Sequence, residues 1–551
     1  MAEAITKEHV LRRNSIERLK LEKSPLDILG ELPQLATRSY ETIPEEDLVR
    51  LKWYGLYHDK PKTGLFMLRV KTPGGQLTPA KVRTIGRISV EFGREYGELT
   101  TRQNIQLHWL QLAQLPEVFA RLTAAGFNTA GACGDTVRNM TGCPVAGLDA
   151  LELFDATPVL QEAARFFDGN PDYADLPRKF KVTITACPHQ CTLPEINCVA
   201  LVPVRLRGRD GFAVRVGGGL STVPRLSKGL GVFIEPADAV PVLRAILDVW
   251  KDTLKYRMSR VKARIKFMLD DVGPEEFRRL VEERLGRRLA DGPLPEPLPG
   301  GHQPGVHPQR QPGLHYIAVP VTAGLVEGSQ LLQLADLAER IGGEVRLTRE
   351  QNFILTHVPD AQVEETVRAL DAIGFPLDVN RVRATSIACT GSPLCNFAVA
   401  LTKPRLIDIM DHLERTFGRA VEDLRINLDG CPHACAQHWI GDIGLQGTTL
   451  RERTDEGGKL EAYDLYLRGG QGVEAAIGVP LVRRVPADEV STYLERLVRL
   501  WLDERQDSEG FKTFTDRQSD ERLVAVAANV PVEEARGRLR RRDSRAEAAD
   551  V

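Results

Sequence analysis

Two short stretches decide the fold: Gly430-Cys-Pro-His-Ala-Cys435 in the second half of the chain and Ala186-Cys-Pro-His-Gln-Cys191 in the first. Further pairs of similar stretches occur in the same order along the two halves: Gly64–Val70 and Gly313–Val319, Thr101–Asn104 and Thr348–Asn352, Leu122–Phe127 and Leu370–Phe375, Thr141–Pro144 and Thr390–Pro393. Because chance does not repeat a series of motifs in order, the sequence predicts an internal duplication.

Each half alternates strand-like and helix-like segments. The apolar stretches Phe66–Val70 and Ile105–Leu110 are typical of strands, whereas Pro79–Tyr96 and Pro116–Ala125 carry apolar residues at helical spacing. Two later segments are also expected to be helical: Pro236–Tyr256 and Pro274–Leu289. This order of elements indicates an α+β fold with pseudo-twofold symmetry.

The composition fits a globular protein of several domains. In 551 residues, hydrophobic side chains make up 42% and charged ones 27%, and 73 Lys and Arg against 75 Asp and Glu leave a net charge of −2. Such a chain offers no general positive field for nucleic acid, and its longest apolar runs, such as Val199–Val204, are too short to cross a membrane. Residues 1–30 contain no apolar signal segment. We therefore expect a cytoplasmic protein without nucleic-acid or membrane partners.

Four of the nine cysteines form a ligand-like pattern in the second half of the chain. Cys389 and Cys395 give C-x5-C, and Cys431 and Cys435 give C-x3-C. Four thiolates suit a cubane [4Fe-4S] cluster, because soft sulfur ligands bind iron–sulfur centres. A structural zinc ion and unliganded buried thiols are the alternatives that the spacing leaves open.

The first half lacks a complete set of ligands. Met140 and Ala146 stand where the second half has its C-x5-C pair, so that only the C-x3-C pair, Cys187 and Cys191, is retained. The sequence therefore predicts one cluster per chain, with Cys187 and Cys191 as packed remnants of the duplication.

One glycine-rich stretch, Gly470–Ala475, fits the G-x-G-x-x-A pattern of dinucleotide binding. Gly478 and Pro480 interrupt the helix that this pattern requires. We therefore expect no nicotinamide or flavin site, and the electrons for a redox reaction must come from a separate protein.

The cysteine pattern resembles that of the sirohaem- and [4Fe-4S]-containing sulfite and nitrite reductases, and most of all the ferredoxin-dependent assimilatory sulfite reductases, from about Tyr54 to Leu502. The resemblance implies a duplicated fold with ferredoxin-like half-repeats and two larger α/β cofactor-binding domains. It implies six-electron reduction of sulfite to sulfide, with nitrite to ammonium as the alternative, and ferredoxin or a similar one-electron donor as the partner. It further implies that Cys435 ligates both the cluster and the sirohaem iron.

The repeats, the resemblance and a Pro- and Gly-rich stretch together suggest a division of the chain, which we expect to act as a monomer. The expected parts are an N-terminal arm (1–60), a first ferredoxin-like half-repeat (61–130), a first sirohaem and substrate domain (131–291), a linker (292–312), a second half-repeat (313–380), a [4Fe-4S] and sirohaem domain (381–505) and a charged, solvated C-terminal tail (506–551).

Reduction of a small oxyanion requires cations that attract it and groups that supply protons. By resemblance, the residues expected to contact the substrate are Arg69, Arg138, Lys179 and Lys181. Those that resemble ligands of the sirohaem carboxylates are Arg102, Gln106 and Arg178. In isolation the charged side chains Arg69, Arg102, Arg138, Lys179 and Lys181 are more typical of a protein surface, and the resemblance is what indicates a role in a site. His433 departs from the family, whose members often carry an amide between the last two cysteines.

Lys181 favours sulfite over nitrite, because sulfite reductases carry Lys at this position and fully ionised sulfite has the larger charge. Tyr57 and Cys133 resemble the partners of a covalent Tyr–Cys link in some ferredoxin-type sulfite reductases, although ordinary core packing explains them equally well. The remaining alternative is a non-catalytic iron–sulfur or zinc protein, which would leave the dispersed basic residues without a role.

Overall fold

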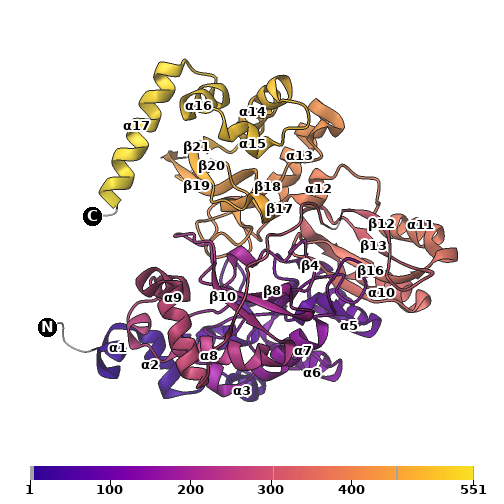
Figure 1. Ribbon diagram of the computed structural model, residues 1–551, viewed down its shortest axis with the longest axis vertical. Helices are drawn as coiled ribbons and strands as arrows, with labels where there is room; N and C mark the ends of the chain where they lie inside the picture. The colour runs from indigo at the N-terminus through magenta and orange to yellow at the C-terminus, as the bar shows by residue number, and fades with distance from the viewer. Residues whose placement is uncertain (1–4, 302, 454–456, 550–551) are drawn as a thin grey trace. The chain divides into compact units, whose positions relative to one another are not determined.

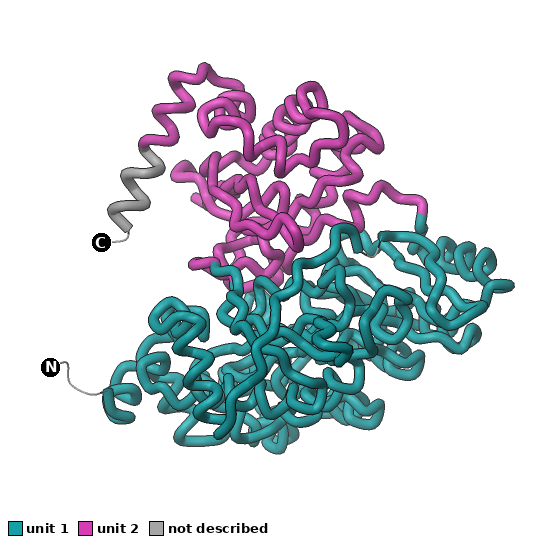
Figure 2. Tube along the Cα trace, viewed as in Figure 1, with its two compact units in different colours: residues 1–219, 225–377 teal, residues 220–224, 378–551 magenta. Residues whose placement is uncertain are grey.

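The computed structural model describes residues 5–301, 303–453 and 457–549. The chain forms two compact units (Figure 2), of which the first contains residues 1–219 and 225–377 and the second contains residues 220–224 and 378–551. We call them the first and the second unit. No helix among the described residues is both long enough and apolar enough to cross a membrane.

The first unit contains eleven α-helices among its described residues (Figure 1). They are α1 (Lys7–Arg13), α2 (Ser15–Glu22), α3 (Ile28–Leu35), α4 (Glu45–Leu51), α5 (Pro79–Phe92), α6 (Leu115–Ala124), α7 (Thr157–Phe167), α8 (Ala239–Lys251), α9 (Ile265–Leu285), α10 (Gly328–Ile341) and α11 (Val363–Ile373). The helix expected at Pro79–Tyr96 ends at Phe92, because Gly93 follows it and the chain turns into a strand at Tyr96.

Two five-stranded sheets of the first unit are built by the half-repeats, and they exchange one strand each. The first sheet has the order β1 (Leu56–His58), β2 (Leu65–Val70), β5 (Ile105–Gln111), β4 (Tyr96–Leu99) and β14 (Leu325–Glu327). The second has the order β12 (Gly305–Pro308), β13 (Leu314–Val319), β16 (Phe353–Pro359), β15 (Val345–Leu347) and β3 (Gln76–Leu77). Because β14 joins the first sheet and β3 joins the second, neither half-repeat is complete without the other.

The repeated Thr-Arg-(Glu)-Gln-Asn motifs form matching turns in the two half-repeats. Gln103 and Gln351 both have positive φ, at 55° and 63°. The side-chain amide of Gln103 donates to the Leu347 carbonyl at 2.9 Å, and that of Gln351 donates to the Leu99 carbonyl at 2.8 Å. Each motif thus binds the backbone of the opposite half, which confirms the duplication.

A six-stranded sheet completes the first unit. Its order is β11 (Ala290–Asp291), β10 (Lys228–Ile234), β9 (Arg209–Val216), β8 (Val199–Leu206), β7 (Val182–Ile184) and β6 (Thr141–Gly142). Strands β6, β7 and β8 are parallel, and the pairs from β8 to β11 are antiparallel. Helices α8 and α9 lie side by side (Figure 1) and bury Leu243, Ile246 and Trp250 with the apolar face of this sheet.

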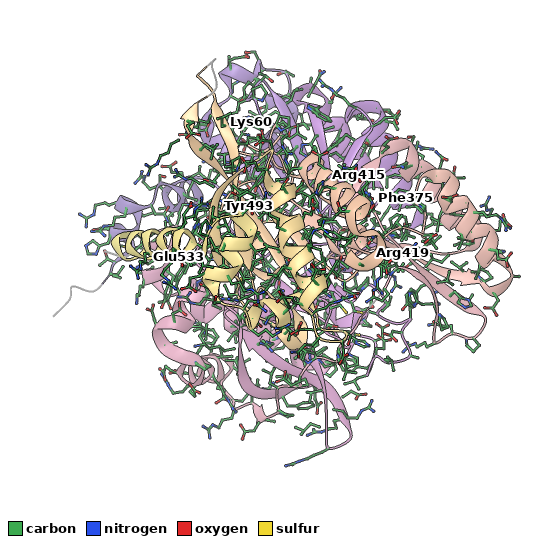
Figure 3. The ribbon with its side chains drawn as sticks, turned by 90° about the horizontal axis from the view of Figure 1, so that it is seen from above. Lys60, Phe375, Arg415, Arg419, Tyr493 and Glu533 are labelled. Carbon is green, nitrogen blue, oxygen red and sulfur yellow. The ribbon has the colours of Figure 1, made fainter. Side chains whose placement is uncertain are left out.

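The second unit repeats that sheet. Its order is β17 (Ile387–Ala388), β18 (Ile426–Asp429), β19 (Ile443–Arg453), β20 (Lys459–Leu467) and β21 (Val479–Pro486), again with a parallel pair of steps followed by antiparallel hairpins. Helices α13 (Lys403–Phe417) and α14 (Val490–Glu504) pack together, and Figure 3 labels Arg415 on the first and Tyr493 on the second. The short helix α12 (Val382–Thr385) precedes β17.

The end of the chain differs from the expected solvated tail. It forms α15 (Phe511–Asp516), α16 (Asp520–Ala528) and α17 (Val532–Ala549). Phe511 and Phe514 are buried, the former with its ring edge against Trp501, and Leu523 is buried on α16. The high charge of this segment led to the expectation of a solvated tail, although a small number of apolar residues recur in it at helical spacing.

The expected linker also contains ordered structure. Residues 305–308 pair with β13 as strand β12, and the preceding segment hydrogen-bonds to the Cys187–Cys191 loop. Proline and glycine in this stretch restrict the backbone without preventing such edge pairing.

Gly75 permits the strand exchange, since it has φ of +71° and a Cβ there would lie 2.6 Å from the Leu347 carbonyl oxygen. We expect Gly75→Ala to lower the apparent Tm by several degrees, because the β3–β15 register would have to shift. Gly208→Ala is the matched control: Gly208 has φ of +75° but open space around it, so its cost is backbone strain alone, about 1–2 kcal/mol. Thermal unfolding followed by circular dichroism compares them, and equal losses would contradict this account.

Candidate active site

The four cysteines of the predicted cluster lie in the second unit, where two parallel strands end. The strands β17 and β18 pair with Ala388 opposite Leu428, and Cys389 and Cys431 follow these strands. Because the carboxyl ends of parallel strands meet at one edge of the sheet, the two cysteine hairpins are brought together there. The backbone amide of Gly430 donates to the Cys389 sulfur at 3.3 Å, which ties one hairpin to the other.

The four thiols form one electrostatic group. Burial raises the pKa of Cys389 well above its usual range, and the nearby Asp429, Cys435 and Cys431 raise it further. Burial also raises the pKa of Cys431 to about 12, with Cys435, Asp429 and Cys395 adding to the effect. Crowded buried thiols of this kind ionise when a metal centre supplies the compensating positive charge.

The spacing of these thiols bears on which metal they fit. Among the residues that the structure describes, no three His, Cys, Asp or Glu side chains converge closely enough for a single metal ion. In a cubane each thiolate binds a different iron, and four soft sulfur ligands suit such a [4Fe-4S] cluster.

Asp429 shapes the last cysteine hairpin, a role that no local sequence pattern indicated. Its carboxylate accepts hydrogen bonds from the backbone amides of Ala436 at 2.7 Å and His438 at 3.1 Å, and pairs with Nδ1 of His438 at 2.9 Å. These bonds support the positive φ of Ala434, at 54°. His433 places Nδ1 3.4 Å from the Cys431 sulfur, so its imidazole stands within hydrogen-bonding distance of a cluster thiol.

In the first unit, Arg102 is the centre of a group of cations. Its guanidinium donates to Asn197 Oδ1 at 3.0 Å and to the carbonyls of Asn139 at 2.6 Å and Val182 at 3.2 Å, while its buried Nε has no hydrogen-bond partner. Desolvation lowers the pKa of Arg102 to about 9; Cys198 opposes the shift, and Arg138, Arg264 and Arg69 add to it. Three of the four neighbouring side chains that act on the charge of Arg102 are therefore cations.

Arg69 and Gln106 form one hydrogen-bonded unit across the neighbouring strands β2 and β5. Nε and Nη2 of Arg69 donate to Gln106 Oε1 at 2.9 and 2.7 Å, and the Gln106 amide donates to Glu98 at 3.1 Å. The Arg69 guanidinium also lies over the Tyr57 ring, 5.7 Å from its centroid, and contacts the carbonyl of Ala132 at 3.5 Å. Tyr57 and the residue before Cys133 thus flank Arg69, whose guanidinium is held in one orientation.

Arg138 and Arg178 are held by the Cys133–Asp135 loop. Arg138 donates twice to the Gly134 carbonyl, at 3.0 and 2.8 Å, and Arg178 pairs with Asp135 at 3.1 Å. Burial alone would raise the pKa of Asp135, but Arg260, Lys20 and Arg178 outweigh it and lower the pKa. Arg260 pairs with the same carboxylate at 2.7 Å and joins the group, although the sequence did not single it out.

Lys179 and Lys181 are half-buried just before β7, and Lys181 borders a buried cationic cluster. Cys198 accepts a hydrogen bond from Arg264 Nη2 at 3.1 Å. Burial opposes ionisation of Cys198, yet Arg264 and the backbone amide of Lys181 outweigh it and lower the pKa of the thiol. Desolvation, followed by Arg264, lowers the pKa of Lys266 to about 8. The sequence analysis did not identify Arg264, Lys266 or Cys198 as part of the site. They are distant from Lys181 in the sequence, and only the fold brings them near it.

A tetrapyrrole with a fringe of carboxylates would add negative charge to this group of cations. The unpartnered Nε atoms of Arg102 and Arg264 and the crowded guanidinium groups fit such a ligand, because carboxylates form strong charge-assisted hydrogen bonds with arginine. The residues of the first unit therefore fit sirohaem, and the cations nearest Lys181 fit a small oxyanion.

Asp59, Glu98 and His108 form a buried ionic group behind Gln106. His108 Nδ1 lies 2.7 Å from Asp59, and Nε2 lies 3.7 Å from Glu98, which also accepts from the Tyr96 hydroxyl at 2.8 Å. Burial would lower the pKa of His108, but the two carboxylates outweigh it and raise it to about 9. His108 is therefore a cation at neutral pH and holds Glu98 in place under Gln106.

The His108 group predicts a pH dependence of stability. A histidine with pKa near 6.5 unfolded and about 9 folded stabilises the protein fully below pH ~6.5, and the contribution is lost as the pH rises through 9. We expect His108→Gln to cost a few kcal/mol at pH 6 and much less above pH 9. Guanidinium unfolding of both proteins across this range measures the difference, and a difference that stays constant with pH would contradict the assignment.

Models of two protein families match the chain. The nitrite and sulphite reductase 4Fe-4S domain matches residues 133–289 and 379–544, and the nitrite/sulfite reductase ferredoxin-like half domain matches residues 58–125 and 307–373. Each model matches once in each half, in agreement with the duplicated sheets.

Relatives of both kinds are similar over nearly the whole chain. "Sulfite reductase [ferredoxin] 2" of Mycolicibacterium paratuberculosis is 36% identical over 538 residues, which cover 93% of this chain and 96% of that protein. "Ferredoxin--nitrite reductase" of Synechococcus elongatus is 36% identical over 498 residues, covering 88% and 96%. The solved structure of Mycobacterium tuberculosis NirA protein matches with a TM-score of 0.87 at 34% identity, over 93% of this chain and 97% of that one.

Proposed function

The chain belongs to the family of nitrite and sulphite reductases, and from this premise we propose that it catalyses the six-electron reduction of sulfite to sulfide with ferredoxin as electron donor. The observation that carries the proposal is the group of crowded, half-buried cations around Arg102, in a chain that also presents a four-cysteine ligand set. A non-catalytic iron–sulfur protein would have no use for these cations. A cytoplasmic location and a monomeric state are part of the proposal. The described residues form no disulfide, which suits a reducing compartment.

The cofactors of the proposed enzyme are sirohaem and one [4Fe-4S] cluster, which when bound supply electrons one at a time to the anion. Four residues are proposed to ligate the cluster: Cys389, Cys395, Cys431 and Cys435. From the family resemblance, Cys435 is also proposed as the sulfur that binds the sirohaem iron. Three are proposed to hold the sirohaem carboxylates: Arg102, Gln106 and Arg178. The buried, unpartnered Nε of Arg102 supports this role most directly.

The substrate-binding cations do two things in the proposed reaction. Gln106 orients Arg69, and the Gly134 carbonyl orients Arg138. Their guanidinium groups can therefore bind an anion with little loss of conformational freedom. Lys179 and Lys181 carry ammonium groups, which can donate protons as the anion loses oxygen. Desolvation lowers the pKa of Lys266 to about 8, and Lys266 and Lys181 both interact with Cys198, which supports the proposal that a lysine here can release a proton.

The choice between the two anions rests on Lys181. The similarity to sulfite and nitrite reductases is equal at 36%, so it does not separate them. Lys181 adds a positive charge beside Arg264 and Lys266, and this excess favours the anion with the larger charge. Nitrite reduction to ammonium stays the second candidate function. Steady-state kinetics of the holoenzyme with reduced ferredoxin and each anion tests the proposal, and absence of sulfide production would overturn it.

We expect Lys181→Asn to lower the sulfite-to-nitrite ratio of kcat/KM by roughly tenfold, the effect of about 1.4 kcal/mol lost for the more highly charged anion. Lys228→Asn removes the same charge from an exposed position at the start of β10 and should leave the ratio unchanged. An unchanged ratio in Lys181→Asn would remove the argument for sulfite.

The duplication supplies a matched pair of variants for the cluster. Cys435→Ser should lose most of the iron and acid-labile sulfide, together with the visible absorption of the tetrapyrrole, because one ligand of the proposed set is gone. Cys191→Ser changes the corresponding cysteine of the first half and should retain both cofactors. Iron and sulfide analysis with absorption spectra of the purified proteins checks this. Retention of a full cluster in Cys435→Ser would contradict the ligand assignment.

A further inference from the structure

Three cysteines of the first unit form a cluster that the proposed reaction does not use. Cys143 and Cys187 are 5% and 1% exposed and lie in one small apolar cluster with Tyr316. The Cys143 thiol is hydrogen-bonded to the Cys187 thiol and interacts electrostatically with that of Cys191. All three thiols also interact electrostatically with the Tyr316 hydroxyl, so they lie in its neighbourhood. We call Cys143, Cys187 and Cys191 the three-thiol cluster.

Parallel strands bring the cluster together. The strands β6 and β7 pair with Gly142 opposite Ile184, and Cys143 and Cys187 follow their carboxyl ends. Cys389 and Cys431 occupy the equivalent edge in the second unit. The first half therefore kept the scaffold that concentrates thiols, while its ligand set changed: the buried Met140 and Ala146 replace two cysteines, and Cys143 adds a new one.

A strap of the Pro- and Gly-rich segment covers Cys191. The backbone amide of Leu298 donates to the Pro188 carbonyl at 2.9 Å, the Gln190 amide donates to the Pro295 carbonyl at 3.1 Å, and His189 contacts the Pro299 carbonyl at 3.0 Å. Gly301 passes so close that a Cβ there would lie 2.7 Å from the Cys191 sulfur. Cys191 is nevertheless the one thiol of the three that is partly exposed.

We propose that the three-thiol cluster is a redox-active site, in which a peroxide converts the Cys143 and Cys187 thiols into a disulfide and Cys191 is the thiol that reacts first. Thiols already in contact need little movement to form a bond. The hydrogen-bonded Cys187 thiol, followed by burial, raises the pKa of Cys143, so Cys143 is a poor first nucleophile and the partly exposed Cys191 is the point of entry. The site is independent of the anion that the enzyme reduces.

The chemistry balances with hydrogen peroxide as the oxidant. The Cys191 sulfur attacks one peroxide oxygen, the O–O bond breaks, one water leaves and a sulfenic acid remains. The Cys187 sulfur displaces the second water and forms a disulfide with Cys191. The Cys143 sulfur then attacks Cys187 and releases Cys191 as a thiol. Overall, two thiols are oxidised by two electrons and one peroxide is reduced to two waters.

Peptide mapping of the holoenzyme tests the proposal. After treatment with hydrogen peroxide, free thiols are alkylated before the protein is unfolded and digested with trypsin without reductant. Trypsin places Cys143 in peptide 139–165 and Cys187, Cys191 and Cys198 in peptide 182–205, and a second cleavage after Glu195 separates Cys198. We expect a cross-link between the two tryptic peptides, located at Cys143 and Cys187 by fragmentation and removed by dithiothreitol. Absence of this cross-link, with Cys191 carried on to sulfinic acid, would overturn the proposal.

Variants separate the roles of the three thiols. Cys143→Ser should lose the cross-link between peptides and leave a loop within peptide 182–205, joining Cys187 to Cys191. Cys191→Ser should form the Cys143–Cys187 cross-link more slowly than the wild type at equal peroxide, because its entry thiol is missing. A cross-link at the wild-type rate in Cys191→Ser would refute the assigned order of reaction. Thermal unfolding of the reduced variants establishes that each is folded before it is compared.

Discussion

The concentration of positive charge around Arg102 is the constraint on which the first unit depends. Guanidinium groups from separate strands and loops meet there, and desolvation already lowers the pKa of Arg102 to about 9. Burying several cations together lowers the stability of the fold unless an anion binds among them. Such a cost to stability is expected of a binding site. Asp135 pairs with Arg178, and Glu98 accepts a hydrogen bond from Gln106, which in turn accepts two from Arg69. The cations of the first unit are therefore arranged so that they can bind an anion.

The duplication explains how one scaffold carries two kinds of sulfur chemistry. In both units a cysteine hairpin follows the central strand of a parallel group, at the edge where the strand ends converge. Four cysteines in the second unit match the ligand set of a cluster. In the first unit the Cys143 thiol is hydrogen-bonded to that of Cys187 and interacts electrostatically with that of Cys191. The backbone arrangement is common to both, so the difference lies in which side chains occupy a few positions.

Strand exchange makes the two half-repeats of the first unit inseparable. Strands β14 and β3 each complete the sheet of the other half, and Gln103 and Gln351 donate to backbone carbonyls across the pair. These contacts hold β2 and β5, and with them Arg69 and Gln106, on a rigid support. A site of this kind tolerates the burial of charge because its elements cannot move apart independently.

The duplication, the α+β class and the positions of the cysteine hairpins could be predicted from the sequence, because they are local patterns that repeat in order. Its candidates Arg69 and Gln106 do form a hydrogen-bonded pair, which strand register made possible but spacing did not reveal. The high charge after Leu502 favoured a solvated tail, and the proline content before β13 favoured an extended linker, because composition averages over a segment and does not report individual contacts. The structure instead forms helices after Leu502 and strand β12. Three interactions became visible only in the folded chain. Asp429 shapes the cluster hairpin, and His108 is charged between Asp59 and Glu98. Arg264 donates a hydrogen bond to Cys198. These interactions join segments distant in sequence, and burial gives them their strength, so no local pattern contains them.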